Sequence, residues 1–320
     1  MDYPGTPGNP FCFRKQLFEG RKEIDMFSTL PYKTQKWLIV TGFLLVPMAL
    51  LCTFTFYPAI KLVYLSFTNW DGLSPDKKLI GWDNYAEVFR NPKIFGVFLH
   101  QIPYFLVGIV QNIAALLFAV ILNGKLKGRH FFRMILFLPF IMNGIAVAFM
   151  FQFVFDTTNG SLNALLGLIG LDSLQTSWLG NAKIVNFSLA SVGFWRFMGY
   201  NMVIYIGALQ AIPGDIYEAA TIDGANGFQQ FWNLTLPNLA KIIELNMFLT
   251  ISGALSVFDL PFVLTAGGPA GASTTFVFKT VETAFQYNNY GLASAMSIVL
   301  LFITIVILGI QSKVINRKGE

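Results

Sequence analysis

The sequence predicts an all-α polytopic membrane protein with six transmembrane helices. Only 12% of its 320 residues are charged and 54% are hydrophobic, whereas a soluble domain has about 25% charged residues. Six windows approach the roughly 20 apolar residues that cross about 30 Å of hydrocarbon. Because these windows lack the alternating pattern of barrel strands, we expect each of them to be a helix.

The first 36 residues are predicted to form a cytoplasmic tail. They carry charges throughout and lack a small-residue cleavage site before the first span, so we expect a retained tail and not a signal peptide. Span one is expected at Trp37–Tyr57. Cys12 falls in the tail and Cys52 in this span, so the two cannot pair and both are predicted to be free thiols.

The second and third spans follow a long loop, about 58–103. This loop combines a turn-rich stretch, "NWDGLSPDKK", with a short amphipathic helix that is expected to end at Asn91-Pro92. Span two is expected at Tyr104–Leu122 and span three at Phe132–Phe155.

The last three spans are expected at Ile184–Leu209, Ile243–Ala266 and Leu292–Ile310. The loop before span four, "DTTNGSLNALLGLIGLDSLQTSWLGN", contains a short apolar helix predicted to lie at the membrane interface, and "TAGGPAGAST" ends span five. The six spans thus form a predicted transmembrane domain, 37–311, and a short cytoplasmic tail, 312–320, follows it. The sequence contains no convincing internal repeat. Four prolines are expected to kink spans: Pro47, Pro103, Pro139 and Pro261.

The distribution of Lys and Arg predicts the orientation, because positive loops stay in the cytoplasm. Of the 22 Lys and Arg residues, 14 lie on the side of the termini and seven on the other side, with Arg196 alone inside a span. Both termini are therefore predicted to be cytoplasmic. The net charge of +5 reflects this bias, so it indicates a membrane and not nucleic acid.

The loop between spans four and five, 210–241, is predicted to form two short helices on the cytoplasmic face. Asp215 and Glu218 have the spacing of a capping box, so the first helix should begin at Asp215. Gly224 permits a turn with positive φ, and the second helix should run from about Phe228 until Pro237. The apolar side chains exceed what a solvated loop needs, so another surface must cover them: Ile216, Tyr217, Ala219, Ala220, Phe228, Phe231, Trp232, Leu234 and Leu236.

This loop resembles the EAA loop of the membrane subunits of bacterial ABC importers. Glu218-Ala219-Ala220 is followed after three residues by Gly224, and after nine more by Leu234-x-Leu236-Pro237, where the family commonly has Ile at the position of Leu234. "YEAATIDGA", "LPNL", "LTAGGP" and the "SFTNWDG…GWDNYAEVF" region are similar to permeases for oligosaccharides, glycerol phosphate and their relatives. The resemblance covers nearly the whole chain except the first 30 or so residues.

The resemblance implies a type I ABC importer permease fold in the bacterial cytoplasmic (inner) membrane, with a cytoplasmic coupling helix. The implied partners are a second homologous permease subunit, two ATP-binding subunits, an extracellular or periplasmic solute-binding protein and a sugar. The chain itself would be non-catalytic and without a cofactor, because ATP and Mg are bound by the partner ATPase. The implied coupling residues are Glu218, Ala219, Ala220, Asp223, Gly224 and Pro237.

The coupling role also has a physical basis in the residues. Small Ala219 and Ala220 permit close docking, Glu218 can accept charge-assisted hydrogen bonds, and Gly224 supplies the bend. The simpler interpretation is that Glu218 only completes a capping box and Gly224 only turns the chain.

Polar and aromatic residues of spans four and five are the candidates for a substrate pathway. A sugar needs hydroxyl partners and aromatic faces, and a charge inside a span commonly marks a pathway or an ion pair. Arg196 and Asp259 are predicted either to pair with each other or to face an aqueous cavity. The candidate residues are Trp195, Arg196, Tyr200, Asn201, Asn246, Ser252, Gly253, Ser256 and Asp259, while Asn143 and Gln152 of span three are ambiguous.

Several function classes lack their motifs. No Gly-rich loop ends in Gly-Lys-Ser/Thr, so the chain should not hydrolyse ATP, and His100 and His130 stand outside any zinc-type cluster. An intramembrane protease would need an acidic partner for Asp259, and a channel or secondary transporter would not need a docking helix. The alternatives that remain are import of glycerol phosphate or an acidic sugar oligomer by the same machinery, or an ATP-independent secondary transporter or channel.

Overall fold

The computed structural model describes residues 31–124 and 126–316. It divides into two compact units, Met1–Lys61 and Leu62–Glu320. Most of the predicted N-terminal tail lies outside the described residues, and so do the predictions that fall on it. The predictions that fall outside the described residues concern Cys12, Arg14, Lys15, Arg21 and Lys22 of the N-terminal tail, and Lys125, Arg317 and Lys318 elsewhere in the chain.

The first unit contains one long apolar helix. It consists of α2 (Tyr32–Leu51) and a π-helical segment, η1 (Cys52–Phe56), and it continues as α3 (Tyr57–Ser66), which runs into the second unit. The helix therefore extends beyond both ends of the predicted span one. No residue of α2 is buried, as expected where side chains face hydrocarbon all round. Cys52 is an exposed free thiol, as predicted.

The second unit begins with the loop that holds α4 (Asp83–Arg90). This is the predicted amphipathic helix, and it ends where Asn91 caps the next helix, α5 (Pro92–Phe95), by accepting from the Lys93 N–H. Asn84 of α4 is buried and its Nδ2 donates to the carbonyls of Ser66 and Thr68, which ties α4 to the end of α3. The segment η2 (Gly96–Gln101) then leads into α6 (Ile102–Asn123), the predicted span two.

Span three is broken, contrary to the continuous helix that was predicted. It forms α7 (Arg129–Ile141) and α8 (Gly144–Val154), which are bent by 100°. The break has a local cause, because the Asn143 Oδ1 accepts from the N–H groups of Ile145 and Ala146 and so starts a new helix.

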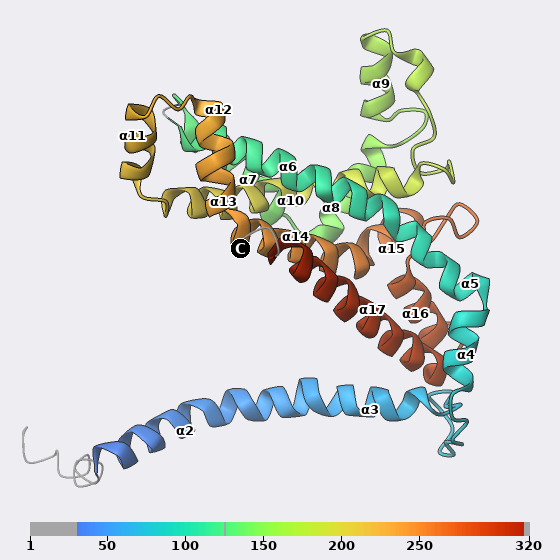
Figure 1. The fold of residues 1–320 in the computed structure, drawn as a ribbon. Helices are drawn as coiled ribbons and strands as arrows, with labels where there is room; N and C mark the ends of the chain where they lie inside the picture. Colours follow the sequence, from blue (N-terminus) through green and yellow to red (C-terminus); the bar gives the residue numbers. More distant parts are fainter. Residues whose placement is uncertain (1–30, 125, 317–320) are drawn as a thin grey trace, which may run out of the picture. The chain divides into compact units, whose positions relative to one another are not determined.

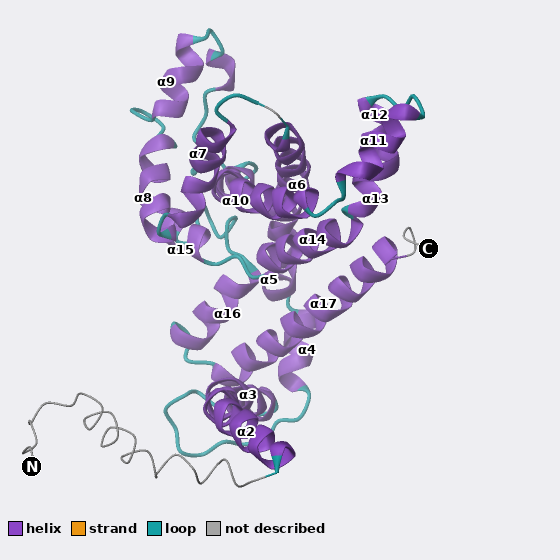
Figure 2. Cartoon of the chain, turned by 90° about the vertical axis from the view of Figure 1, so that its left-hand side faces the viewer, coloured by secondary structure: helices purple, strands orange, loops and turns teal. Residues whose placement is uncertain are grey.

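The next segment contains α9 (Ser161–Leu168), the short helix η3 (Asp172–Leu174) and α10 (Val185–Gln210). The first two form a small lobe that projects beyond α8 in Figures 1 and 2. Its centre is Asn163, whose amide donates to the carbonyls of Thr157 and Thr176 and accepts from the Trp178 indole N–H. The predicted interfacial helix therefore exists, and its position at a membrane surface stays a prediction.

The loop after α10 folds into the two predicted short helices, seen together in Figures 1 and 2. The first is α11 (Gly214–Ile222), and the second contains α12 (Gly227–Gln230), a π-helical segment η4 (Phe231–Thr235) and α13 (Leu236–Asn238). A bend of 67° separates this second helix from α14 (Ala240–Leu255).

Span five is also interrupted. After α14 the chain leaves the helix at Ser256 and resumes as α15 (Asp259–Thr265), which ends at Ala266 in the left-handed region. The amphipathic α16 (Phe276–Phe285) precedes α17 (Tyr290–Asn316), which contains the predicted span six and is longer at both ends.

The buried apolar clusters of the second unit lie along α10, against α6, α7 and α8, and between α4, α16 and α17. Met202, Tyr205 and Leu239 are buried in one of these clusters, and Val147, Leu189 and Val192 in another. Helices α10 and α7 approach each other closely, because a methyl group added at Gly199 would collide with the Leu136 carbonyl. Glycine is required where two backbones approach this closely.

Three helical stretches of the described residues are long and apolar enough to span a membrane: Tyr32–Ser66, Pro92–Asn123 and Tyr290–Lys313. Counting each bent pair, α7 with α8 and α12–α13 with α14, as one span raises the number to five. Helix α10 has 26 residues but is outside this count, because polar residues such as Asn186, Arg196 and Asn201 lower its hydropathy. The number of six spans therefore stays a prediction.

Candidate functional site

The two short helices between α10 and α14 form one structured unit, residues 214–238, which we call the hairpin. The hydroxyls of Tyr217 and Thr235 lie 3.0 Å apart and join its two helices, and the Gln230 amide donates to Thr221 Oγ1. Gly224 sits at the turn with φ of 83°, as its predicted role requires. Internal bonds thus give the hairpin a fixed shape.

The predicted capping box at Asp215 and Glu218 is wrong. The helix already begins at Gly214, so Asp215 lies inside the first turn and accepts only from the N–H of Ile216. A capping box forms instead at the second helix, where the Gln229 N–H donates to Asn226 Oδ1 and the Asn226 N–H donates to Gln229 Oε1. Glu218 is therefore not needed to cap the helix.

The hairpin exposes the residues that were predicted to dock. Glu218, Ala219, Asp223, Gly224 and Pro237 are exposed, and Ala220 is half-buried. Large apolar side chains share this exposure: Ile222 is 87% exposed, Phe228 72% and Trp232 51%. An apolar surface of this kind on an ordered element is typical of a protein interaction site.

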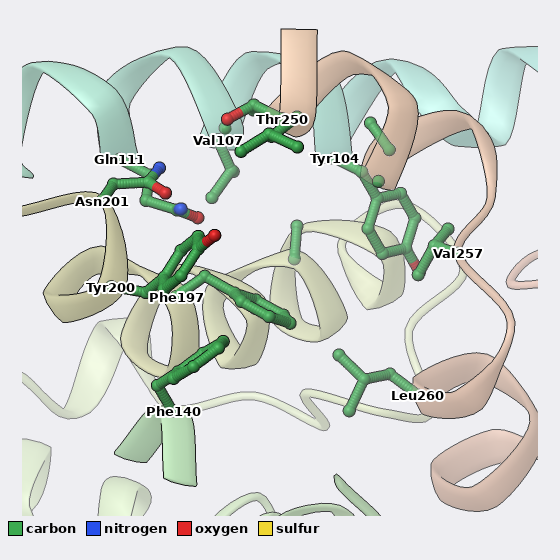
Figure 3. A pocket seen from close by; sticks show the side chains of 16 residues that line it. Tyr104, Val107, Gln111, Phe140, Phe197, Tyr200, Asn201, Thr250, Val257 and Leu260 are labelled. Carbon is green, nitrogen blue, oxygen red and sulfur yellow. The ribbon is translucent and has the colours of Figure 1, made fainter. Parts of the chain in front are cut away.

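A second feature is a cavity of about 310 Å³ between α6, α10 and α14, with α7 and α15 at its edge (Figure 3). One end is polar, because Gln111, Asn201 and Thr250 lie there. The side of α10 and α7 is aromatic, with Phe197 and with Phe140 stacked on Tyr200 at 4.4 Å between ring centroids. The remaining lining residues are Tyr104, Val107, Gly108, Ala190, Gly193, Leu249, Gly253, Ala254, Val257 and Leu260.

Only three of the nine predicted pathway residues line this cavity, namely Tyr200, Asn201 and Gly253. Trp195 is not in the lining, and its ring packs edge-on against Phe151 of α8, with 5.3 Å between the ring centroids. Asn246 is fully buried one turn before Thr250, next to the Tyr205 hydroxyl, and both of its amide atoms lack a hydrogen-bond partner of good geometry.

The other predicted pathway residues lie at or near helix ends. Ser256 is exposed as the C-terminal cap of α14 and Asp259 is exposed in the first turn of α15, while Ser252 is half-buried on α14. Of the span-three residues, Asn143 caps α8 and Gln152 is exposed.

Arg196 and Asp259 do not pair. The one ion pair among the described residues joins Lys279 and Glu282. Arg196 instead places Nη2 3.4 Å from the Met142 carbonyl at the break between α7 and α8, and its guanidinium lies 5.1 Å from the ring centroid of Phe197. Its Nε is buried and has no hydrogen-bond partner among the described residues.

Several residues of the cavity were not predicted from the sequence. Gln111 and Tyr104 come from α6, which looks like a uniformly apolar span, and Phe140 precedes the unpredicted helix break. The available signal was the pair Gln111-Asn112 inside this span, because buried amides are costly and mark functional or packing contacts.

Asn112 organises a buried polar network beside the cavity. Its Nδ2 donates to the Gly108 carbonyl and to Thr250 Oγ1, at 3.0 and 2.7 Å. Its Oδ1 accepts from the Tyr205 hydroxyl at 3.1 Å and from the Asn201 amide at 3.5 Å. This network links α6, α10 and α14 behind the polar end of the cavity.

No group of three or more His, Cys, Asp or Glu side chains close enough to hold a metal ion occurs in the part of the chain that the structure describes. The His100 side chain forms a hydrogen bond with the backbone, since its Nδ1 lies 2.8 Å from the Thr274 carbonyl oxygen.

Comparison with known proteins identifies the family. The model of the binding-protein-dependent transport system inner membrane component matches residues 111–318, which is more than half of the chain. The chain belongs to this family. The match contains most of the cavity and the whole hairpin, and the family description places the chain in the inner membrane.

Relatives of this inner membrane component extend over nearly the same length. The chain is 36% identical to the probable ABC transporter permease protein YurN of Bacillus subtilis (strain 168), over 88% of this chain and 98% of the relative. It is 33% identical to the multiple sugar-binding transport system permease protein MsmF of Streptococcus mutans, over 87% of this chain and 95% of the relative.

A solved structure shares the fold of this inner membrane component. It is a bacterial ABC transporter involved in the import of the acidic polysaccharide alginate, and it matches with a TM-score of 0.77. The identity is 22%, and the match covers 90% of this chain and 98% of the other. The permease fold predicted from the sequence is thereby confirmed.

Proposed function

We propose that this chain is the permease subunit of an ATP-driven importer of a carbohydrate, most simply an oligosaccharide. The chain forms half of the translocation pathway, and a second, related permease forms the other half. Two ATP-binding subunits lie on the cytoplasmic side and a solute-binding protein docks on the opposite side. Both termini and the hairpin face the cytoplasm.

The observation that carries the proposal is the uncovered apolar surface of the hairpin. Ile222, Phe228 and Trp232 are mostly exposed although the hairpin has a fixed shape, and exposing such residues to water permanently is unfavourable. Glu218 and Ala219 lie on the same element. A subunit that binds and hydrolyses ATP covers this surface and transmits its closure to the helices.

The cavity supports a saccharide as the cargo. Amides and a hydroxyl at one end and aromatic rings on a side are the groups that bind the hydroxyls and the C–H faces of sugars. The name of MsmF, with its multiple sugar-binding transport system, is in keeping with this substrate class. An acidic oligosaccharide is the second candidate, favoured by the fold that the chain shares with the alginate importer.

The coupling role is tested by reversing the charge of Glu218. The complete complex is reconstituted in vesicles with its binding protein, and ATP-dependent uptake is measured. We expect Glu218→Lys to lower uptake by at least about tenfold, because a lost charge-assisted contact costs on the order of 1.5–3 kcal/mol. Insertion and the amount of permease in the membrane stay unchanged.

The matched control is Lys127→Glu, which reverses an exposed charge in the loop between α6 and α7, outside the hairpin. It should leave uptake within about twofold of the wild type, because isolated surface charges contribute little. Normal ATP-dependent uptake by Glu218→Lys would show that the hairpin does not couple.

A further inference from the structure

Among the residues that the structure describes, neither a cation nor a carboxylate lines the cavity. All 16 lining residues are apolar, aromatic, hydroxyl-bearing or amide-bearing. We propose that this wall selects an uncharged saccharide and excludes uronate and phosphorylated solutes. The proposal rests on the proposed function and decides between its two candidate substrates.

The cation of α10, Arg196, is not in the lining, although its guanidinium lies 5.1 Å from the ring centroid of the lining residue Phe197. Arg196 lies between cavity residues on α10, directly before Phe197 and one turn before Tyr200. Its guanidinium lies at the end of α7, where Nη2 is 3.4 Å from the Met142 carbonyl. A positive charge is favourable there, because the C-terminus of a helix carries partial negative charge.

Gly144 makes room for this arrangement. A methyl group added at Gly144 would lie 2.7 Å from Nη1 of Arg196, so the guanidinium occupies the space over the first residue of α8. Arg196 thus contacts the break between α7 and α8. Its charge stabilises this break and does not bind an anionic solute.

The nearest carboxylate is also outside the wall. Asp259 precedes the lining residue Leu260, but it is exposed in the first turn of α15 and does not line the cavity. The described lining residues therefore carry neither a positive nor a negative charge that could pair with a solute.

The polar end suits hydroxyl groups. Gln111 is 7% exposed, points into the cavity beside Asn201 (Figure 3), and its amide makes no hydrogen bond with another described residue. An amide both donates and accepts, as a sugar hydroxyl does, so the two are complementary. A carboxylate or phosphate only accepts, and without a cation the amide and hydroxyl donors compensate its removal from water only in part.

The inference is tested by offering two mixtures to the complete complex in vesicles, one of neutral di- and trisaccharides and one of oligouronates of the same lengths. The vesicle contents are analysed by mass spectrometry after addition of ATP and the binding protein. We expect neutral sugars to accumulate at least about 100-fold more than oligouronates, since an unpaired buried charge costs several kcal/mol.

Two variants assign the selectivity to this chain. Gln111→Arg places a cation in the wall. It should lower the uptake of neutral sugars by at least about tenfold, and it should also lower the ratio of neutral-sugar uptake to oligouronate uptake. Arg196→Gln should lower the uptake of both mixtures by the same factor, because Arg196 contacts the helix break and does not line the cavity.

Each contrary result has a separate meaning. Preferential accumulation of oligouronates, or a selective loss of oligouronates in Arg196→Gln, would overturn the inference and leave the sugar importer standing. ATP-dependent accumulation of neither mixture would contradict the proposed function itself.

Discussion

At the scale of single residues, two asparagines of the core have opposite environments. Asn112 is 4% exposed and satisfies its amide through Thr250, Gly108 and Tyr205. Asn246 is fully buried beside the Tyr205 hydroxyl, yet neither of its amide atoms has a partner of good geometry among the described residues. A buried polar group is favourable only when it is hydrogen-bonded, so the same substitution should have opposite effects at the two positions.

We predict that Asn246→Leu raises the thermal midpoint of the purified complex and that Asn112→Leu lowers it. The first replaces an unpaired amide and should stabilise by about 1 kcal/mol, while the second leaves the Tyr205 hydroxyl and Thr250 without their partner and should destabilise by about 2 kcal/mol. Melting followed by tryptophan fluorescence in detergent measures both. Equal shifts of the two variants would contradict the described network.

The sequence predicted the chemical types at the cavity better than their positions. Tyr200, Asn201 and Gly253 line it, whereas Trp195 and Asn246, chosen for the same reasons, do not. A helix that is apolar on every side gives no periodic signal of which face meets the cavity. For the same reason Gln111, on α6, was missed.

At the scale of helices, the spans divide into continuous and broken ones. Helices α6 and α17 follow the predicted spans, because nothing in them competes with the helical backbone. Spans three and five break at Asn143 and after Leu255. Hydropathy is averaged over windows longer than these breaks, so it detects the apolar content of a span and misses the interruption. In span three, Asn143-Gly144 after Pro139 is a local signal for the end of one helix and the start of the next.

The contact between α7 and α10 depends on one glycine. Gly199→Ala should destabilise the protein by about 1–3 kcal/mol, because the added methyl group meets the Leu136 backbone and the helices must move apart. Gly207→Ala on the same helix is the control. No atom lies within 4 Å of its added methyl group, so it should be neutral or stabilising by up to about 1 kcal/mol.

Thermal midpoints of the two glycine variants in detergent test this contact. If Gly199→Ala melted at the temperature of Gly207→Ala, the close packing of α7 against α10 would be wrong.

At the scale of the whole molecule, the chain has surfaces that the proposed complex would cover. It has a cavity wall, an apolar helix without buried residues in α2, and a hairpin with an uncovered apolar surface. The hairpin was predicted in position and shape, because Gly224 and Pro237 are strong local signals and its spacing matches a known loop. The cavity was not, since it arises from helices distant in the sequence.

The orientation of the hairpin and its covering by a partner are tested together by one cysteine. Ala219→Cys is introduced after Cys12 and Cys52 are changed to Ser, and Asn159→Cys in the loop between α8 and α9 serves as the control for the opposite side. Labelling uses a maleimide that cannot cross the membrane. The charge bias of the loops predicts that Ala219→Cys reacts only from the cytoplasmic side and Asn159→Cys only from outside.

The most direct measurement compares labelling of Ala219→Cys in the permease alone and in the complete complex with its ATP-binding subunits. The account predicts rapid labelling of the permease alone and a reduction of at least about tenfold in the complex, because the docked subunit covers the hairpin. Equal labelling in both, or labelling from the outer side, would contradict the claim that this hairpin is where ATP hydrolysis is coupled to transport.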